Sequence, residues 1–314
     1  MTDRRIRALL LGLCLAAAVS ATASSQETKK KALDYDISVR AITLAVTVQG
    51  RGGGFVNDLT QSDFTIYENG VRQRMTYFQH DFDAPLSLTI LLDVSGSMAV
   101  QDKLAECQAG LRDFLTSFIG PKDEVSLLVF ADGEVEVAAP FSNDRSRILA
   151  ELDKARAYGK TALNDAVAVS PEYAGKGKNE KRALLLLTDG IENDSRSSSD
   201  KALEIARRVD VPIYTIGYKI PLGEQLLEKY RKTKDLTSAG IIATLDRFSQ
   251  ATGGRAFFVT QPRDLRASLF EIKQELSHQY IIGYTSYVSA DGEYRRIQVV
   301  ASKKRFRVRA RLGY

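Results

Sequence analysis

The feature that most constrains the fold is an alternation of short apolar runs and longer amphipathic segments between Asp83 and Ser277. We predict that the apolar runs are strands, at residues 87–92, 125–130, 183–187, 212–216 and 256–259, with an antiparallel edge around 134–138. The amphipathic segments are predicted helices, at residues 103–119, 145–156, 162–173, 200–209, 241–251 and 263–276. Because right-handed crossovers between parallel strands place helices on both faces of a sheet, this order predicts an α/β fold with a doubly wound, mostly parallel sheet.

Alternation of apolar and polar residues with a period of two indicates β structure at both ends of the chain. This pattern is found at residues 42–48, 64–67, 71–78, 280–284, 295–300 and 306–312. Asn69-Gly70 and Asp291-Gly292 are typical turn signals between neighbouring runs. Because neither end is large enough to bury a core alone, we predict that 35–83 and 278–314 form one small, all-β, sandwich-like domain, with 84–277 inserted in it.

The first residues have the layout of a cleavable secretory signal. Three arginines precede an apolar stretch at 8–19, and Ala21-Thr-Ala23 offers small residues for cleavage. We therefore expect a signal peptide at 1–23 and a flexible lead at 24–34, and export to the periplasm or beyond. The formal charge of +5 would fall to +3 with the loss of three arginines and one aspartate, and so mild an excess does not indicate a nucleic-acid partner.

Such a mature chain would keep one cysteine, Cys107, which cannot form an intrachain disulfide. It shares one helical face with Leu104, Leu111, Phe114 and Leu115. We therefore expect Cys107 to be buried as a small apolar side chain.

Oxygen-bearing side chains follow two of the predicted strands. Asp93, Ser95 and Ser97 come directly after one strand, and Asp189 ends another. Thr161 precedes a predicted helix. Aspartate and hydroxyl oxygens are ligands that Mg²⁺ prefers, and the carboxyl ends of parallel strands are where open α/β sheets bind ligands. Taken singly, these residues are also explained as a turn at Asp189 and a helix cap at Thr161.

These three stretches together resemble the metal-ion-dependent adhesion site of von Willebrand factor A domains. The resemblance lies in Asp93-Val-Ser95-Gly-Ser97, in Thr161-Ala-Leu-Asn-Asp165 and in Leu187-Thr-Asp189-Gly190, and it spans about residues 84 to 277. The flanks, including 59–70 and 280–284, resemble the acidobacterial-type von Willebrand factor A-related proteins.

The resemblance implies a Rossmann-like fold and a bound Mg²⁺, with Mn²⁺ or Ca²⁺ as alternatives. Ser95 and Ser97 would bind the ion directly, Thr161 directly or through water, and Asp93 and Asp189 largely through water. Asp165 would support these ligands or stabilise its helix. The resemblance also implies a protein partner that offers an acidic side chain to the ion. We place Gly96 and Gly190 beside that partner and give the loop at 219–239 a role in choosing it.

Three other functions are weaker or remain open. Nucleotide hydrolysis by a phosphate loop ending in Gly159-Lys160-Thr161 would need a glycine where Lys154 stands. A serine hydrolase would need a base, and the only histidines, His80 and His278, lie at the expected domain borders, where we expect them on the surface. A scaffold whose ion only stabilises the fold is the main alternative to a binding protein.

Four arginines alternate with apolar residues near the carboxyl terminus, at Arg305, Arg307, Arg309 and Arg311. A period of two would place all four on one face of a strand, where they could contact an acidic envelope surface. The simpler interpretation, which we favour, is a solvated strand face that discourages edge-to-edge association.

Overall fold

The computed structural model describes residues 37–220, 237–289, 293–303 and 305–314. The expected signal peptide, the lead at 24–34, the turn at Asp291-Gly292 and most of the 219–239 loop lie outside these ranges. Among the described residues, no helix has the length and apolar character needed to cross a bilayer.

The central sheet has six strands in the order β10-β9-β8-β5-β6-β7. Every neighbouring pair is parallel except β6 and β7, so the predicted fold class and the antiparallel edge are both confirmed. The strands are β5 (Leu86–Asp93), β6 (Glu124–Ala131), β7 (Glu134–Ser142), β8 (Lys181–Thr188), β9 (Ile213–Tyr218) and β10 (Ala256–Val259). Strands β5, β6 and β8 are buried along their whole length except at Arg182, as expected for strands covered on both faces.

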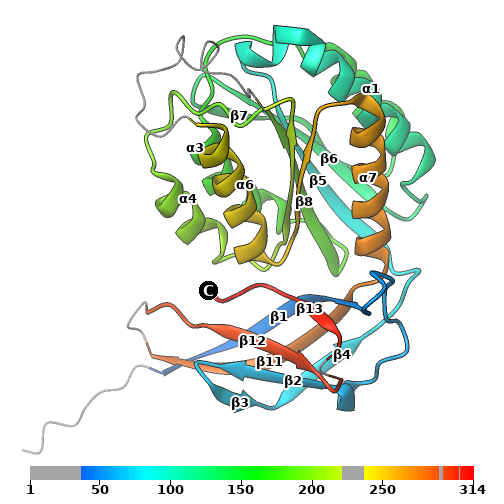
Figure 1. Ribbon diagram of the computed structural model, residues 1–314, viewed down its shortest axis with the longest axis vertical. Coiled ribbons are helices and arrows are strands. Elements are labelled where there is room, and N and C mark those ends of the chain that lie inside the picture. Colours follow the sequence, from blue (N-terminus) through cyan, green and yellow to red (C-terminus); the bar gives the residue numbers. More distant parts are fainter. Residues whose placement is uncertain (1–36, 221–236, 290–292, 304) are drawn as a thin grey trace, which may run out of the picture. The chain divides into compact units, whose positions relative to one another are not determined.

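Helices cover both faces of this sheet (Figure 1). One core packs α1 (Lys103–Ser117), α2 (Arg145–Lys154) and α7 (Pro262–Ser277) against one face. The opposite core packs α3 (Leu163–Ala174), α4 (Ser199–Ala206) and α6 (Ser238–Thr252) against the other. Cys107 lies in the first core and is fully buried, as predicted, and burial raises the pKa of its thiol far above the ordinary value.

Strands from the two ends of the chain share two further sheets, with orders β13-β1-β11-β4 and β12-β2-β3. Long-range pairing joins β1 to β11 and β13, and β2 to β12. Both sheets contribute to a third core, which includes Leu44, Ile66 and Tyr280. The strands are β1 (Ile37–Gln49), β2 (Phe64–Glu68), β3 (Val71–Gln73), β4 (Met75–Gln79), β11 (Tyr280–Ser289), β12 (Ile297–Ala301) and β13 (Arg307–Arg309), and a short 3-10 helix covers Gln61–Asp63.

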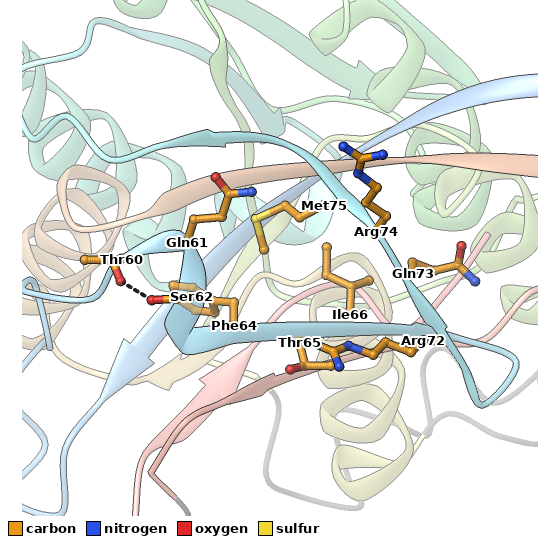
Figure 2. Close-up of a pocket in the computed structure, with 10 residues that line it drawn as sticks. All are labelled: Thr60, Gln61, Ser62, Phe64, Thr65, Ile66, Arg72, Gln73, Arg74 and Met75. Carbon is orange, nitrogen blue, oxygen red and sulfur yellow. Dashed lines mark hydrogen bonds between the residues drawn. The ribbon is translucent and has the colours of Figure 1, made fainter.

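The segment 71–78, expected to be one strand, is divided at Arg74. Its first part pairs with β2 in one sheet, and its second part pairs with β11 in the other, so the chain changes sheets at this residue. A cavity of about 950 Å³ lies at this change of sheet, lined by Arg74, Met75 and the start of β2 (Figure 2). Thr60 and Ser62 also line it, and their hydroxyl oxygens are 2.8 Å apart (Figure 2).

The carboxyl-terminal arginines do not form one exposed face. Arg309 forms an ion pair with Glu275 of α7, and Arg311, which is 4% exposed, pairs with Asp210. Only Arg305 and Arg307 of the four are exposed. The expectation of a four-arginine surface is therefore wrong, because two of the guanidinium groups neutralise carboxylates of the α/β region.

The two histidines also differ from expectation, since both are half-buried rather than on the surface. His80 stacks on Tyr280 with 3.9 Å between ring centroids, and His278 stacks on Phe55 at 4.7 Å. Burial lowers the pKa of His80, with a smaller contribution from Lys181. Aromatic packing therefore occupies both imidazole rings.

We predict that Arg309→Gln destabilises the protein by about 3 kcal/mol, because it leaves the fully buried Glu275 carboxylate without a positive charge. Urea unfolding followed by circular dichroism measures the change. The matched variant Arg307→Gln removes an exposed arginine of the same strand and should change stability by less than about 0.5 kcal/mol. Equal effects of the two changes would contradict this account of the ion pair.

Candidate metal site

The candidate site lies where β5 and β8 end side by side. Leu92 of β5 is in register with Leu187 of β8, so Asp93 and Asp189 both leave the sheet at its carboxyl edge. From β5 the chain continues towards β6, whereas from β8 it continues towards β9 on the opposite side. This reversal of strand order makes the edge the ligand-binding crevice of a doubly wound sheet.

The two serine hydroxyls lie together directly after β5. The Ser95 backbone N–H donates to Asp93 Oδ1 at 2.9 Å, which folds the loop back over the strand end. Ser95 Oγ and Ser97 Oγ are 3.1 Å apart. Two neighbouring ligands of an octahedral Mg²⁺, each at about 2.1 Å, would be about 3.0 Å apart. The two hydroxyls share a hydrogen bond, and their spacing is also compatible with two neighbouring ligands of such an ion.

The loop before Thr161 packs against this turn. The Gly96 N–H donates to the Gly159 carbonyl at 3.0 Å, and the Tyr158 N–H donates to the Val94 carbonyl at 2.8 Å. Gly159 has a φ of +65°, and a Cβ there would lie 2.2 Å from the Asp132 carboxylate. The close approach of Asp132 therefore favours glycine at this position.

Thr161 is tied in turn to the loop that follows Asp189. Its N–H donates to Asn193 Oδ1 at 2.9 Å, and its carbonyl accepts from the backbone N–H groups of Asn193 and Asp194 at 3.1 and 3.0 Å. The three stretches that carry the predicted site residues are thus joined by hydrogen bonds.

Thr161 does not cap α3, whose N-cap is Ala162. Instead, the Asn164 N–H donates to the Glu192 carboxylate at 2.9 Å and to the Ser195 hydroxyl at 3.0 Å. The alternative interpretation of Thr161 as a helix cap is therefore wrong.

Asp165 acts on the same loop from within α3. Its carboxylate accepts from the N–H groups of Arg196 at 2.8 Å and Ser197 at 3.0 Å, and these bonds help to lower its pKa. Asp165 thus fixes the loop that runs from Asp189 to α4.

The two aspartates are fully buried, at 0% exposure each. Asp93 Oδ2 accepts from the Thr188 hydroxyl at 2.5 Å, and Asp189 Oδ2 is 2.7 Å from the Lys103 ammonium nitrogen. Burial, and next the charge of Asp189, raise the pKa of Asp93 to about 7. A pair of buried carboxylates with one ammonium partner favours the addition of another positive charge.

The chemistry of these donors fits a hard divalent cation. Within the described ranges, no group of three or more His, Cys, Asp or Glu side chains is arranged to hold a metal ion. The candidate set instead combines three hydroxyls with two carboxylates, all at most 5% exposed. Oxygen donors of this kind suit Mg²⁺, Mn²⁺ or Ca²⁺ rather than softer metals.

The expectation that Gly190 faces a partner is wrong. Gly190 is buried, and a Cβ there would lie 2.2 Å from Ile241 Cγ2 of α6. Gly96 is half-buried, and a Cβ on it would lie 3.0 Å from the Gly159 carbonyl oxygen. Both glycines allow close packing at the carboxyl edge of the sheet.

Sequence reasoning missed Lys103, Thr188, Glu192 and Asn193. A signal for Lys103 was present, because it precedes Cys107 and Leu111 by four and eight residues and so lies on the apolar stripe of α1. The other three carried no such signal, since polar residues are common at strand ends and in the loops that follow them.

Comparisons with known proteins find similarity in the α/β region. Residues 88–192 match the family model described as the von Willebrand factor type A domain. An uncharacterized protein of Borreliella burgdorferi is 26% identical over 140 residues, or 43% of this chain and 41% of its own length. The uncharacterized protein sll0103 of Synechocystis is 28% identical over 157 residues, or 48% of this chain and 36% of its own length. The matched region thus spans well under half of either relative.

Among solved structures, the open conformation of the pilus adhesin SpaC from Lactobacillus rhamnosus GG is similar, with a TM-score of 0.50 and 11% identity. The alignment covers 79% of this chain and 47% of that one. Identity at this level shows likeness of fold alone. From the family match over β5 to β8 and the loops that follow them, we conclude that residues 88–192 belong to a von Willebrand factor type A domain.

Proposed function

We propose that this chain is an exported, non-enzymatic binding protein that engages a protein ligand through a divalent cation. The observation that carries the proposal is the cluster of buried hydroxyl and carboxylate oxygens at the β5–β8 edge, with the serine oxygens 3.1 Å apart. The sequence layout of residues 1–23 supports export.

Each residue of the site would have a distinct task. Ser95, Ser97 and Thr161 would bind the cation through neutral oxygens, and Asp93 and Asp189 would balance its charge. When bound, Mg²⁺ would supply a coordination position open to a carboxylate oxygen of the partner. Because neutral hydroxyls withdraw little of the ion's charge, an acidic side chain would be the preferred ligand.

Adhesion is the form of binding that we favour. The pilus adhesin SpaC has the same fold, and a cation-dependent contact with a second protein would suit such a role. This likeness motivates the test and assigns no partner.

A second candidate is a scaffold whose cation only stabilises the fold. The burial of the oxygens favours it, because Ser97, the most exposed of the five residues, is only 5% exposed. In that case the cation would raise stability without any gain in partner binding.

Affinity capture separates the two candidates. The full chain, immobilised in Mg²⁺, is exposed to solubilised envelope proteins and eluted with a chelator. A binding protein should retain partners that elute with the chelator and that Asp93→Ala fails to retain. An envelope protein that the wild type and Asp93→Ala capture equally is not evidence of cation-dependent binding. A scaffold would retain no protein that elutes with the chelator.

We predict that 5 mM Mg²⁺ raises the melting temperature of the wild-type chain by several degrees and that of Asp93→Ala by less than one degree, because the variant lacks one carboxylate of the site. Differential scanning calorimetry checks this. Asp194→Asn is the matched control, since Asp194 lies at the same edge but pairs with the exposed Lys160. It should respond to Mg²⁺ as the wild type does, and a full response of Asp93→Ala would rule out the site.

The raised pKa of Asp93 predicts a pH dependence in the presence of chelator. Between about pH 4 and the raised value near 7, the folded chain holds a proton on Asp93 that the unfolded chain has released. Stability from this group is therefore lost as the pH rises through that window, by about 2–4 kcal/mol. The free energy of unfolding in urea is measured at each pH for the wild type and for Asp93→Asn. It should decline with rising pH in the wild type but not in Asp93→Asn. Parallel curves would contradict the assignment.

A further inference from the structure

Lys103 is a buried lysine at the edge of the candidate site. It is the first residue of α1 and is 3% exposed. Its ammonium nitrogen lies 2.7 Å from Asp189 Oδ2 and 3.4 Å from the Ser97 carbonyl oxygen. It therefore contacts two of the stretches that would surround the cation.

Two local features at the start of α1 are unfavourable. A positive charge in the first turn of a helix is unfavourable, because the amino end of the helix dipole is itself positive. The two residues before it, Gln101 and Asp102, both have left-handed backbone conformations with φ of +58° and +56°. Non-glycine residues rarely adopt this conformation. Such local costs persist where the surroundings compensate for them, and the Asp189 carboxylate compensates for the charge of Lys103.

The charges of the site explain what Lys103 does. Two buried carboxylates alone would carry a charge of −2, which a divalent cation would neutralise completely. With the Lys103 ammonium group beside Asp189, the protein contributes −1, so a site that holds a divalent cation keeps a net positive charge. A net positive charge in a buried site attracts a carboxylate from a partner.

We propose that Lys103 is a tethered cation that competes with the divalent ion for Asp189, weakening ion binding and strengthening the capture of a carboxylate ligand. This inference rests on the proposed function. If Lys103 competes in this way, removal of its charge should strengthen the binding of the divalent ion and weaken the binding of the carboxylate. A purely structural ion pair would not produce these opposite changes.

The test compares the full-length wild type with Lys103→Met, which keeps the length of the side chain and removes its charge. Mn²⁺ binding is measured by electron paramagnetic resonance of the free ion. We expect Lys103→Met to bind Mn²⁺ at least tenfold more tightly than the wild type. Acetate is then titrated into each Mn²⁺-saturated protein and followed by water-proton relaxation. Acetate affinity should fall at least threefold in the variant.

Lys181→Met is the matched control. Lys181 is also 3% exposed, and its ammonium group donates to the backbone carbonyls of Asp81 and Ser277. Its replacement removes another buried lysine, at the start of β8, and leaves the contacts of Asp189 unchanged. It should lower the melting temperature and leave the Mn²⁺ and acetate affinities within twofold of wild type.

The outcomes distinguish this inference from the proposed function. If the wild type binds Mn²⁺ and Lys103→Met binds it equally or less tightly, the competition is refuted and the proposed function stands. If neither protein binds Mn²⁺, the proposed function fails, and this inference fails with it. Lys103→Gln is a second variant without the charge, and its folding is checked by circular dichroism. Like Lys103→Met, it must bind Mn²⁺ more tightly and acetate more weakly than the wild type. It replaces Lys103→Met if that variant does not fold.

Discussion

The structure depends on the burial of two carboxylates where β5 and β8 end. Asp93 and Asp189 are both fully buried, which is costly unless positive charge and hydrogen bonds compensate. Thr188, the Ser95 backbone and Lys103 provide part of that compensation. Under the proposed function, a divalent cation would add further positive charge beside them. The loop before Thr161 is joined by hydrogen bonds to the turn after β5 and to the loop after β8.

A second set of buried charges joins the α/β region to the strands from the chain ends. Glu275 of α7 accepts from the Tyr214 hydroxyl at 2.7 Å and pairs with Arg309 of β13, while Arg311 pairs with Asp210. Each pair joins a buried side chain to a partly exposed one, and such a pair is costly to break because it leaves a buried charge without its partner. They explain why an alternating arginine pattern is not a free surface here.

The sequence was most informative where hydrophobic periodicity is strong. The buried strands and amphipathic helices of residues 83–277 were predicted to within a few residues of their observed ends, because apolar runs and helical stripes report directly on burial. The segment 71–78 was predicted as one strand, since a change of sheet at Arg74 depends on partners more than 200 residues away. For the same reason the pairing of Arg309 and Arg311 could not be predicted.

The sequence by itself determined the α/β class and the positions of Asp93, Ser95, Ser97 and Asp189 at or after strand ends, since these follow from local pattern and spacing. Only the tertiary structure decided which charges meet. Lys103 and Asp189 are separated by 86 residues, and parallel packing of β5 beside β8 brings them to 2.7 Å. Local sequence sets which face of an element is buried, but the energy of a buried charge depends on neighbours that only the complete fold supplies.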